Sequence, residues 1–317
     1  MIRSPESLTI ALLTNRLIDS DAKALTAREF WKTFPHDQLL SGIIDMDVSQ
    51  LTSHLNLKEE DARRIRTLLD ASRALAFESE RLEESGISMV TAADEAFPAK
   101  LRASLGEQCP AMLLVAGPSE WLSEPGVGIV GSRKITESHE EVAADVARSA
   151  VRDGFGVISG LARGIDQVAM RTGLEVGGRV CGIPTEGIRT ISRNSDIRAA
   201  VQEGALTIAS PYRPDAPFSV GNAMGRNKLI YGLADATVII TSDSGKGGTW
   251  EGALEAMKKN YGRVLVWDGP DVGAGNAALI AKGAERLTDL SDSKWLEPQD
   301  TADFHALPSK VEPQHLF

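Results

Sequence analysis

The sequence predicts an α/β protein with a doubly wound, mostly parallel sheet, preceded by a small helical domain. Six short apolar runs recur every 25 to 31 residues in the second half of the chain. Most of the gaps between them have the apolar spacing of helices. Short buried strands that alternate with helices are typical of a parallel sheet covered on both faces. The six runs begin at Val127, Phe155, Val180, Ala205, Ala236 and Arg263.

Three parts are expected along the chain: a helical N-terminal domain over residues 1–90, the sheet domain over 91–296 and a polar tail over 297–317. In the first part, Ser4 is a candidate N-cap, a turn falls near Asn56, and Gly86 ends the helical pattern. The residues between Gly86 and Gly126 read as a strand, a loop and another strand. A packing or protein-contact role is favoured over nucleic-acid binding for the helices, because no glycine-rich hairpin joins them.

Composition restricts the class of protein and the kind of ligand site. A net charge of −10 argues against binding nucleic acid over the whole surface, so any anion site must be a local pocket. No apolar run approaches the roughly 20 residues of a membrane helix, and the N-terminus has no clear signal pattern. Cys109 and Cys181 have no metal-ligand spacing and are expected to be reduced structural thiols. A cytoplasmic protein is therefore expected.

Two loops with glycine and arginine follow the first two apolar runs. The first loop contains Gly131, Ser132, Arg133 and Lys134; the second contains Ser159, Gly160, Arg163 and Gly164. Glycine lets backbone N–H groups approach an anion, and arginine can chelate a phosphate at the positive end of the next helix. Asp166 would cap that helix and could orient Arg163. Ordinary turn chemistry could explain either loop alone.

Two further segments are expected at the same edge of the sheet. Arg226, Asn227 and Lys228 are placed just ahead of a helix, and a glycine-rich phosphate loop opens another helix at Thr249. This loop consists of Gly245, Lys246, Gly247, Gly248 and Thr249. Neither the dinucleotide fingerprint nor the P-loop order is present. Because ligands bind outside the carboxyl ends of parallel strands, the four segments together predict a pocket for an anionic ligand.

The successive segments resemble the signatures of the DprA/Smf DNA-processing family, with similarity over roughly residues 97–290. The stretches that carry it are "VGSRKIT", "SGLARGID", "GRNKLIYGLAD" and "SGKGGTWEGALEA". The resemblance implies an extended Rossmann-like domain that binds single-stranded DNA at a sheet-edge pocket, forms a homodimer and helps to load a RecA-type recombinase. It implies no established catalytic activity, no cofactor and no metal. The basic residues of the first two loops and of Arg226–Lys228 match the family's motif positions.

Departures from the family pattern keep two alternatives open. Met170 stands where a histidine is usual, and "IPTEGIRTISRN" replaces a stretch with a tyrosine-proline pair. These favour a divergent member outside natural transformation. The glycine-rich loop also resembles that of lysine-decarboxylase-like phosphoribohydrolases, in which case Glu251 would be catalytic. A sensor for a nucleotide signal is the other alternative; otherwise we assign no catalytic residue.

Aromatic side chains make up only 5% of the chain, so little base stacking is expected. Phe218, Tyr231 and Trp250 are the plausible stacking platforms near the predicted pocket. Packing in the core is the favoured interpretation for each of the three.

Overall fold

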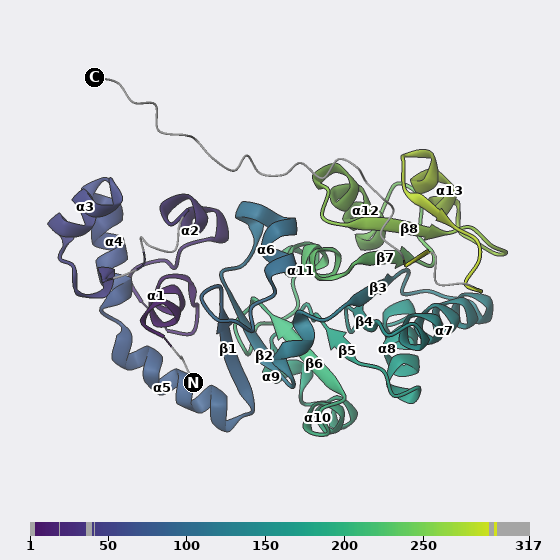
Figure 1. The fold of residues 1–317 in the computed structure, drawn as a ribbon, viewed down its shortest axis with the longest axis horizontal. Helices are drawn as coiled ribbons and strands as arrows, with labels where there is room; N and C mark the ends of the chain where they lie inside the picture. The colour runs from purple at the N-terminus through teal and green to yellow at the C-terminus, as the bar shows by residue number, and fades with distance from the viewer. Residues whose placement is uncertain (1–3, 19, 36–39, 41, 292–294, 297–317) are drawn as a thin grey trace, which may run out of the picture.

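The structure is a computed structural model that describes residues 4–18, 20–35, 40, 42–291 and 295–296. The predicted polar tail over residues 297–317 lies outside the described residues. Within the described part, nine strands form one sheet in the order β1-β2-β6-β5-β4-β3-β7-β8-β9 (Figure 1). The strands are β1 Ile87–Thr91, β2 Met112–Ala116, β3 Gly126–Val130, β4 Gly156–Ser159, β5 Val180–Gly182, β6 Leu206–Ser210, β7 Ala236–Ile239, β8 Arg263–Trp267 and β9 Glu285–Leu287.

The predicted parallel sheet is confirmed. β3 through β9 pair in parallel, and only β1 with β2 and β2 with β6 are antiparallel among the described strands. Each of the six predicted apolar runs contains one strand from β3 to β8. The central strands β3, β4 and β7 are buried throughout, as expected for strands covered on both faces.

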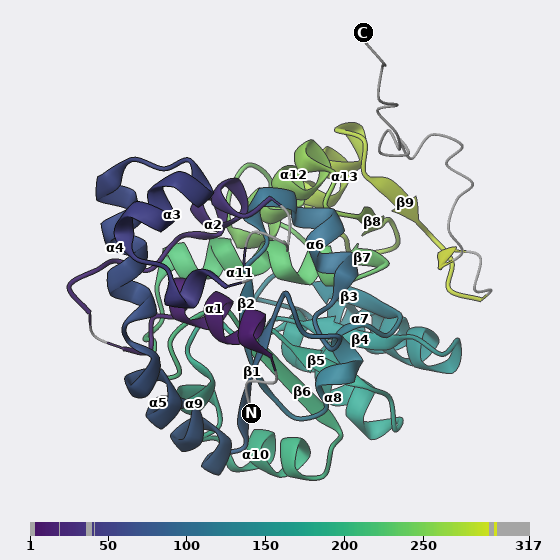
Figure 2. The same ribbon diagram turned by 60° about the vertical axis from the view of Figure 1, so that its left-hand side comes forward.

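Helices cover both faces of the sheet (Figures 1 and 2). One apolar cluster packs α7 and α8 against the sheet and continues into the N-terminal helices. A second cluster packs α6, α11 and α12 against the opposite face. The helices of the sheet domain are α6 Ala99–Leu105, α7 Glu137–Arg152, α8 Ile165–Glu175, α9 Ile188–Ile191, α10 Ser195–Gln202, α11 Val220–Leu233, α12 Gly248–Lys259 and α13 Ala274–Ala281.

The N-terminal region is helical, as predicted. Its helices are α1 Pro5–Thr14, α2 Ala27–Thr33, α3 Val48–Leu55, α4 Glu59–Leu69 and α5 Ser72–Glu84. The Ser4 side chain caps α1, Asn56 ends α3 in the left-handed conformation, and Gly86 at φ +71° follows α5. None of the described helices is both long and apolar enough to span a bilayer.

Side-chain hydrogen bonds join the N-terminal helices to the sheet domain. The indole N–H of Trp31 in α2 donates to the carbonyl oxygen of Cys109, at 2.7 Å. The Ser7 hydroxyl in α1 donates to Asp94, at 2.6 Å. β1 spans residues 87–91 and therefore crosses the domain boundary that we expect at residue 90. The position of that boundary stays a prediction. Because these bonds and a continuous apolar cluster link the two regions, we expect them to stabilise each other.

Both cysteines are free and buried, in agreement with the interpretation as reduced structural thiols. Burial raises the pKa of the Cys109 and Cys181 thiols to about 12. A thiol with such a high pKa is nearly all protonated at neutral pH and is a poor nucleophile.

Trp31→Phe is expected to lower the free energy of unfolding by about 1–3 kcal/mol, because it leaves the buried Cys109 carbonyl without its donor. Urea denaturation followed by circular dichroism measures this loss. Phe77→Ala is the matched control: Phe77 is 62% exposed, and its removal should change stability by no more than about 0.5 kcal/mol. Equal stabilities of the two variants would contradict a stabilising role for the Trp31 hydrogen bond.

Candidate nucleic-acid interface

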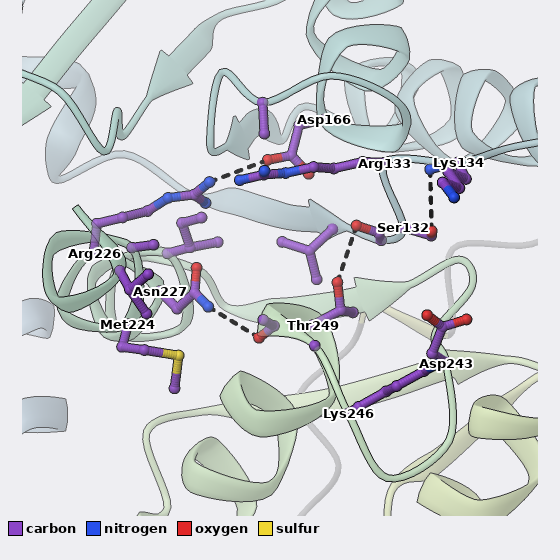
Figure 3. A pocket seen from close by; sticks show the side chains of 18 of the residues that line it. Ser132, Arg133, Lys134, Asp166, Met224, Arg226, Asn227, Asp243, Lys246 and Thr249 are labelled. Atoms are coloured by element: carbon purple, nitrogen blue, oxygen red, sulfur yellow. Dashed lines mark hydrogen bonds and ion pairs between the residues drawn. The ribbon is translucent and has the colours of Figure 1, made fainter. Parts of the chain in front are cut away.

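A cavity of about 480 Å³ opens at the carboxyl end of β3. Four segments line it: the loop after β3, the loop and helix start after β4, α11 with the residue Phe218 before it, and the glycine-rich loop before α12 (Figure 3). This is the edge of the sheet at which the sequence predicts an anion pocket. The cavity therefore brings together segments that lie more than one hundred residues apart in the chain.

The first loop supplies exposed cations to the cavity. The backbone N–H of Ser132 donates to the carbonyl oxygen of Thr241, at 3.0 Å. The Ser132 hydroxyl accepts from the backbone N–H of Lys134, at 3.2 Å. These bonds hold the loop between β3 and β7. Arg133 and Lys134 line the cavity and are exposed. Gly131 is required for packing, because a Cβ there would lie 2.5 Å from the Ile165 side chain.

The second loop shapes the cavity but contributes few ligand groups. Ser159 is fully buried, and its hydroxyl donates to the Ile129 carbonyl oxygen at 2.6 Å. Gly160 leaves room for the guanidinium of Arg226, which a Cβ would overlap. Gly164 has φ +82° and lies against the backbone of Ser132, so only glycine fits there. Arg163 is exposed and does not line the cavity.

The prediction that Arg226, Asn227 and Lys228 precede a helix is wrong. They lie inside α11, which begins at Val220 after an N-cap at Ser219. Two glycines in its first half, at 221 and 225, weaken the local helix preference and conceal the start. α11 also packs in the second apolar cluster, through residues that include Leu229 and Leu233.

The three residues divide between the two sides of α11. Arg226 and Asn227 line the cavity. The Asn227 side-chain amide donates to the Gly248 carbonyl oxygen at 3.0 Å and so ties α11 to the glycine-rich loop. Lys228 does not line the cavity; its ammonium group bonds to Gln108 at 2.8 Å and pairs with Glu255 at 3.1 Å.

Arg226 forms a buried ion pair with Asp166, at 3.6 Å between Nη2 and Oδ2. The two residues are 6% and 4% exposed. Burial raises the pKa of the Asp166 carboxyl, while Arg226 and the backbone N–H groups of Ala162 and Gly160 oppose the rise. Asp166 thus pairs with Arg226, and the expectation that it orients Arg163 is wrong. Sixty residues separate the partners, so the sequence carried no local signal for the pair.

The glycine-rich loop closes the opposite wall of the cavity. Gly245 and Gly247 have φ +75° and +93°, a backbone region that favours glycine. The helix begins at Gly248, one residue before the predicted start, and the Thr249 hydroxyl donates to the Gly131 carbonyl oxygen at 3.0 Å. Lys246, Gly247, Gly248 and Thr249 line the cavity, whereas Gly245 does not. Glu251 is exposed on α12 and is absent from the lining.

One aromatic ring is exposed at the cavity. Phe218 is 49% exposed, and the guanidinium carbon of Arg133 lies 5.9 Å from its ring centroid. Core packing was the favoured interpretation for Phe218, and that interpretation is wrong. For Tyr231 and Trp250 it is confirmed, because they are only 2% and 6% exposed. Phe218 lies in the loop before α11 and lines the cavity.

The charged side chains that line the cavity form two groups, a buried pair and an exposed set at the rim. Asp166 and Arg226 largely neutralise each other at the buried end. The exposed cations are Arg133, Lys134 and Lys246, and the exposed carboxylate in the lining is Asp243. The cavity therefore presents a net positive rim on a protein of net charge −10. Such a rim attracts a phosphate without attracting nucleic acid to the rest of the surface.

The family model for DNA recombination-mediator protein A matches residues 88–294, more than half of the chain. The chain belongs to this family, that of the DprA and Smf proteins. Protein Smf of Synechocystis is 32% identical over 54% of this chain and 43% of its own length. Protein Smf of Escherichia coli is 28% identical over 70% of this chain and 62% of its own length. The chain thus spans less than two thirds of these two relatives.

Further matches of this DprA/Smf family member cover most of the matched proteins' own lengths. DNA processing protein DprA of Bacillus subtilis is 25% identical over 83% of this chain and 87% of its own length. The solved structure of DprA from Streptococcus pneumoniae superimposes with a TM-score of 0.71 at 18% identity, over 92% of this chain and 98% of its own. DprA from Helicobacter pylori gives a TM-score of 0.53 at 23% identity, over 64% and 92%. At these identities the two structures show a shared fold, the extended Rossmann-like sheet.

Asp166→Asn is expected to lower the free energy of unfolding by about 3–5 kcal/mol, because the buried Arg226 then lacks its counter-charge. Urea titration of the purified variant measures the loss. The double variant Asp166→Asn/Arg226→Met removes both charges and should be more stable than Asp166→Asn. If the double variant were the less stable of the two, the ion pair would not account for the effect.

Proposed function

We propose that this protein binds single-stranded DNA at the cavity beside β3 and α11. The observation that carries the proposal is the exposed combination of Arg133, Lys134 and Lys246 with the Phe218 ring. Cations that follow a phosphate backbone, together with an aromatic platform for a base, are the two requirements for binding a single strand. A rigid duplex keeps its bases stacked inside and cannot use such a platform.

Both family membership and a solved relative support this proposal. The structure of DprA from H. pylori is described in terms of a single-stranded DNA binding mode, and it shares the sheet fold. The residues at the cavity rim belong to the loops that follow the parallel strands, where ligands bind in such sheets. Phosphate contacts would position the strand without reading its sequence.

The proposal extends to assembly and cellular role. As a DprA/Smf protein, the chain would act in the cytoplasm as a homodimer and pass the bound strand to a RecA-type recombinase. The family resemblance supports these three points. The chain covers 43% and 62% of the length of the two Smf relatives, so the recombinase step depends on the proposal that the matched region suffices.

The phosphoribohydrolase alternative has no specific observation in its favour. Its catalytic candidate, Glu251, is exposed on α12 and does not line the cavity. The nucleotide-sensor alternative uses the same cavity, and a titration with mononucleotides beside oligonucleotides separates it from strand binding. A sensor would bind the mononucleotide at least as tightly as the oligonucleotide.

Arg133→Ala is expected to weaken binding of every single-stranded oligonucleotide by a similar factor. The slope of log affinity against log salt should fall in magnitude by about 0.7, the value for one phosphate contact on a single strand. Fluorescence anisotropy at several salt concentrations measures both quantities. Arg171→Ala is the matched control, because Arg171 lies on α8 outside the cavity and is exposed. If the two variants had the same affinity and slope, strand binding at this cavity would be refuted.

Phe218→Ala is expected to cost about 1–3 kcal/mol of binding free energy, because stacking of one base on the ring is lost. Phe218→Trp should retain most of the affinity, and the salt slope should stay constant in both variants, since no charge changes. The same anisotropy titration measures these effects. A loss shared equally by the Ala and Trp variants would show that stacking is not the contribution of this ring.

A further inference from the structure

Two hollows lie between the N-terminal helices and the sheet domain, and one of them is also lined by Gly225, Lys228 and Leu229 of α11. Their volumes are about 210 and 220 Å³. Arg16, which follows α1, and Arg213, in the loop between β6 and α11, line both of them. We call the pair of hollows the junction groove.

The charged side chains in the described lining of the junction groove are all basic. This lining contains four cationic side chains and no carboxylate, on a protein of net charge −10. The cations are Arg16, Lys23, Arg213 and Lys228. A concave surface with charge of one sign raises the local potential and favours an anionic ligand.

Two of these cations are available to a ligand. Arg16 and Lys23 are exposed, and their side chains make no hydrogen bond or ion pair with any residue that the structure describes. Lys228 also faces the groove, although its charge is shared with Glu255. Arg16 and Lys23 are therefore the cations of the groove that can bind an anionic ligand, and both belong to the N-terminal region.

The junction groove and the DNA-binding cavity are lined by different sides of α11. Met224, Arg226 and Asn227 face the cavity, while Gly225 and Lys228 face the groove. Tyr212 lies at the boundary, and its hydroxyl donates to the Asn222 carbonyl oxygen at 2.7 Å. Burial raises the pKa of Tyr212 to about 12, and Arg226 and Arg16 both oppose the rise. Tyr212 is therefore within reach of charges from both sites.

The groove contains partly or fully buried apolar residues such as Leu25, Met112 and Leu229, but no large hydrophobic side chain is exposed in its described lining. The large hydrophobic side chains exposed in the described part of the chain are Phe77, Val176, Phe218 and Val220, and none of them lines the groove. Protein interfaces depend on buried aromatic and aliphatic anchors, whereas contacts to a phosphate backbone depend on cations. The chemistry of the groove thus fits a polyanion.

We propose that the junction groove is a second phosphate-binding site, in which Arg16 and Lys23 hold the part of a DNA strand that extends beyond the cavity past α11. This inference rests on the proposed binding of single-stranded DNA at the cavity. It gives the helical N-terminal region a direct part in DNA binding, in place of the packing or protein-contact role that its sequence favours. Long strands would contact both sites, and short strands would contact the cavity alone.

The test compares oligothymidylates of about 4 and about 16 nucleotides, the limits of site size for a single-strand-binding module. Arg16→Glu should weaken binding of the long strand about three- to tenfold and lower its salt slope by about 0.7, because one phosphate contact is lost. Affinity for the short strand should change less than about twofold, since the cavity is unaltered. Arg73→Glu, on the exposed surface of α5 outside both sites, is the matched control for charge and should leave both affinities unchanged.

Three outcomes would overturn the inference. The first is equal affinity of Arg16→Glu and Arg73→Glu for the long strand. The second is an equal loss for both strand lengths, which would place Arg16 in the cavity site. The third is a loss of polyglutamate binding with unchanged binding of the long strand, which would indicate an acidic protein partner. Arg133→Ala in parallel separates the two proposals: if it changes neither length, strand binding at the cavity fails, whatever Arg16→Glu shows.

Discussion

The buried ion pair between Arg226 and Asp166 determines the arrangement of the cavity. It joins the start of α8 to the middle of α11, two helices that belong to different strand-helix units. A guanidinium without a counter-charge is costly in such a buried place, so each partner requires the other. Gly160 must then lack a side chain, because the space for its Cβ is filled by Arg226. The second glycine loop owes its composition to this pair and to close packing.

This arrangement separates residues that build the cavity from residues that meet a ligand. Ser159, Gly160 and Gly164 hold the backbone in place, and Arg226 stands at the buried end with its charge balanced. The exposed groups, Arg133, Lys134 and Lys246, are free to contact phosphates at the rim. A buried frame with exposed cations at its edge suits a ligand whose charge repeats along its length. Binding would then depend on salt more than on the identity of the bases.

α11 contributes to two sites, because its two sides face different hollows of the surface. One side lines the cavity and the other side lines the junction groove, so a small shift of the helix would alter both. Trp31 and Ser7 anchor the N-terminal helices to the sheet domain and thereby position Arg16 and Lys23 in the junction groove. The stability of these anchors is therefore relevant to the proposed DNA binding as well as to folding.

The sequence by itself determined the presence of the sheet, the parallel direction of the strands in the second half of the chain and the edge of the sheet at which the cavity lies. Periodic apolar runs and glycine-rich turns are local signals, and the loop of Arg133 and Lys134 carries its chemistry within a few residues. The order of the four motif stretches along the chain indicated the DprA/Smf family. Only the tertiary structure decided that Asp166 pairs with Arg226, that Lys228 turns away from the cavity and that Phe218 is exposed. Those outcomes depend on contacts between segments 60 to 120 residues apart, such as Lys228 with Gln108. Burial and charge pairing across that separation arise from packing and have no counterpart in local sequence.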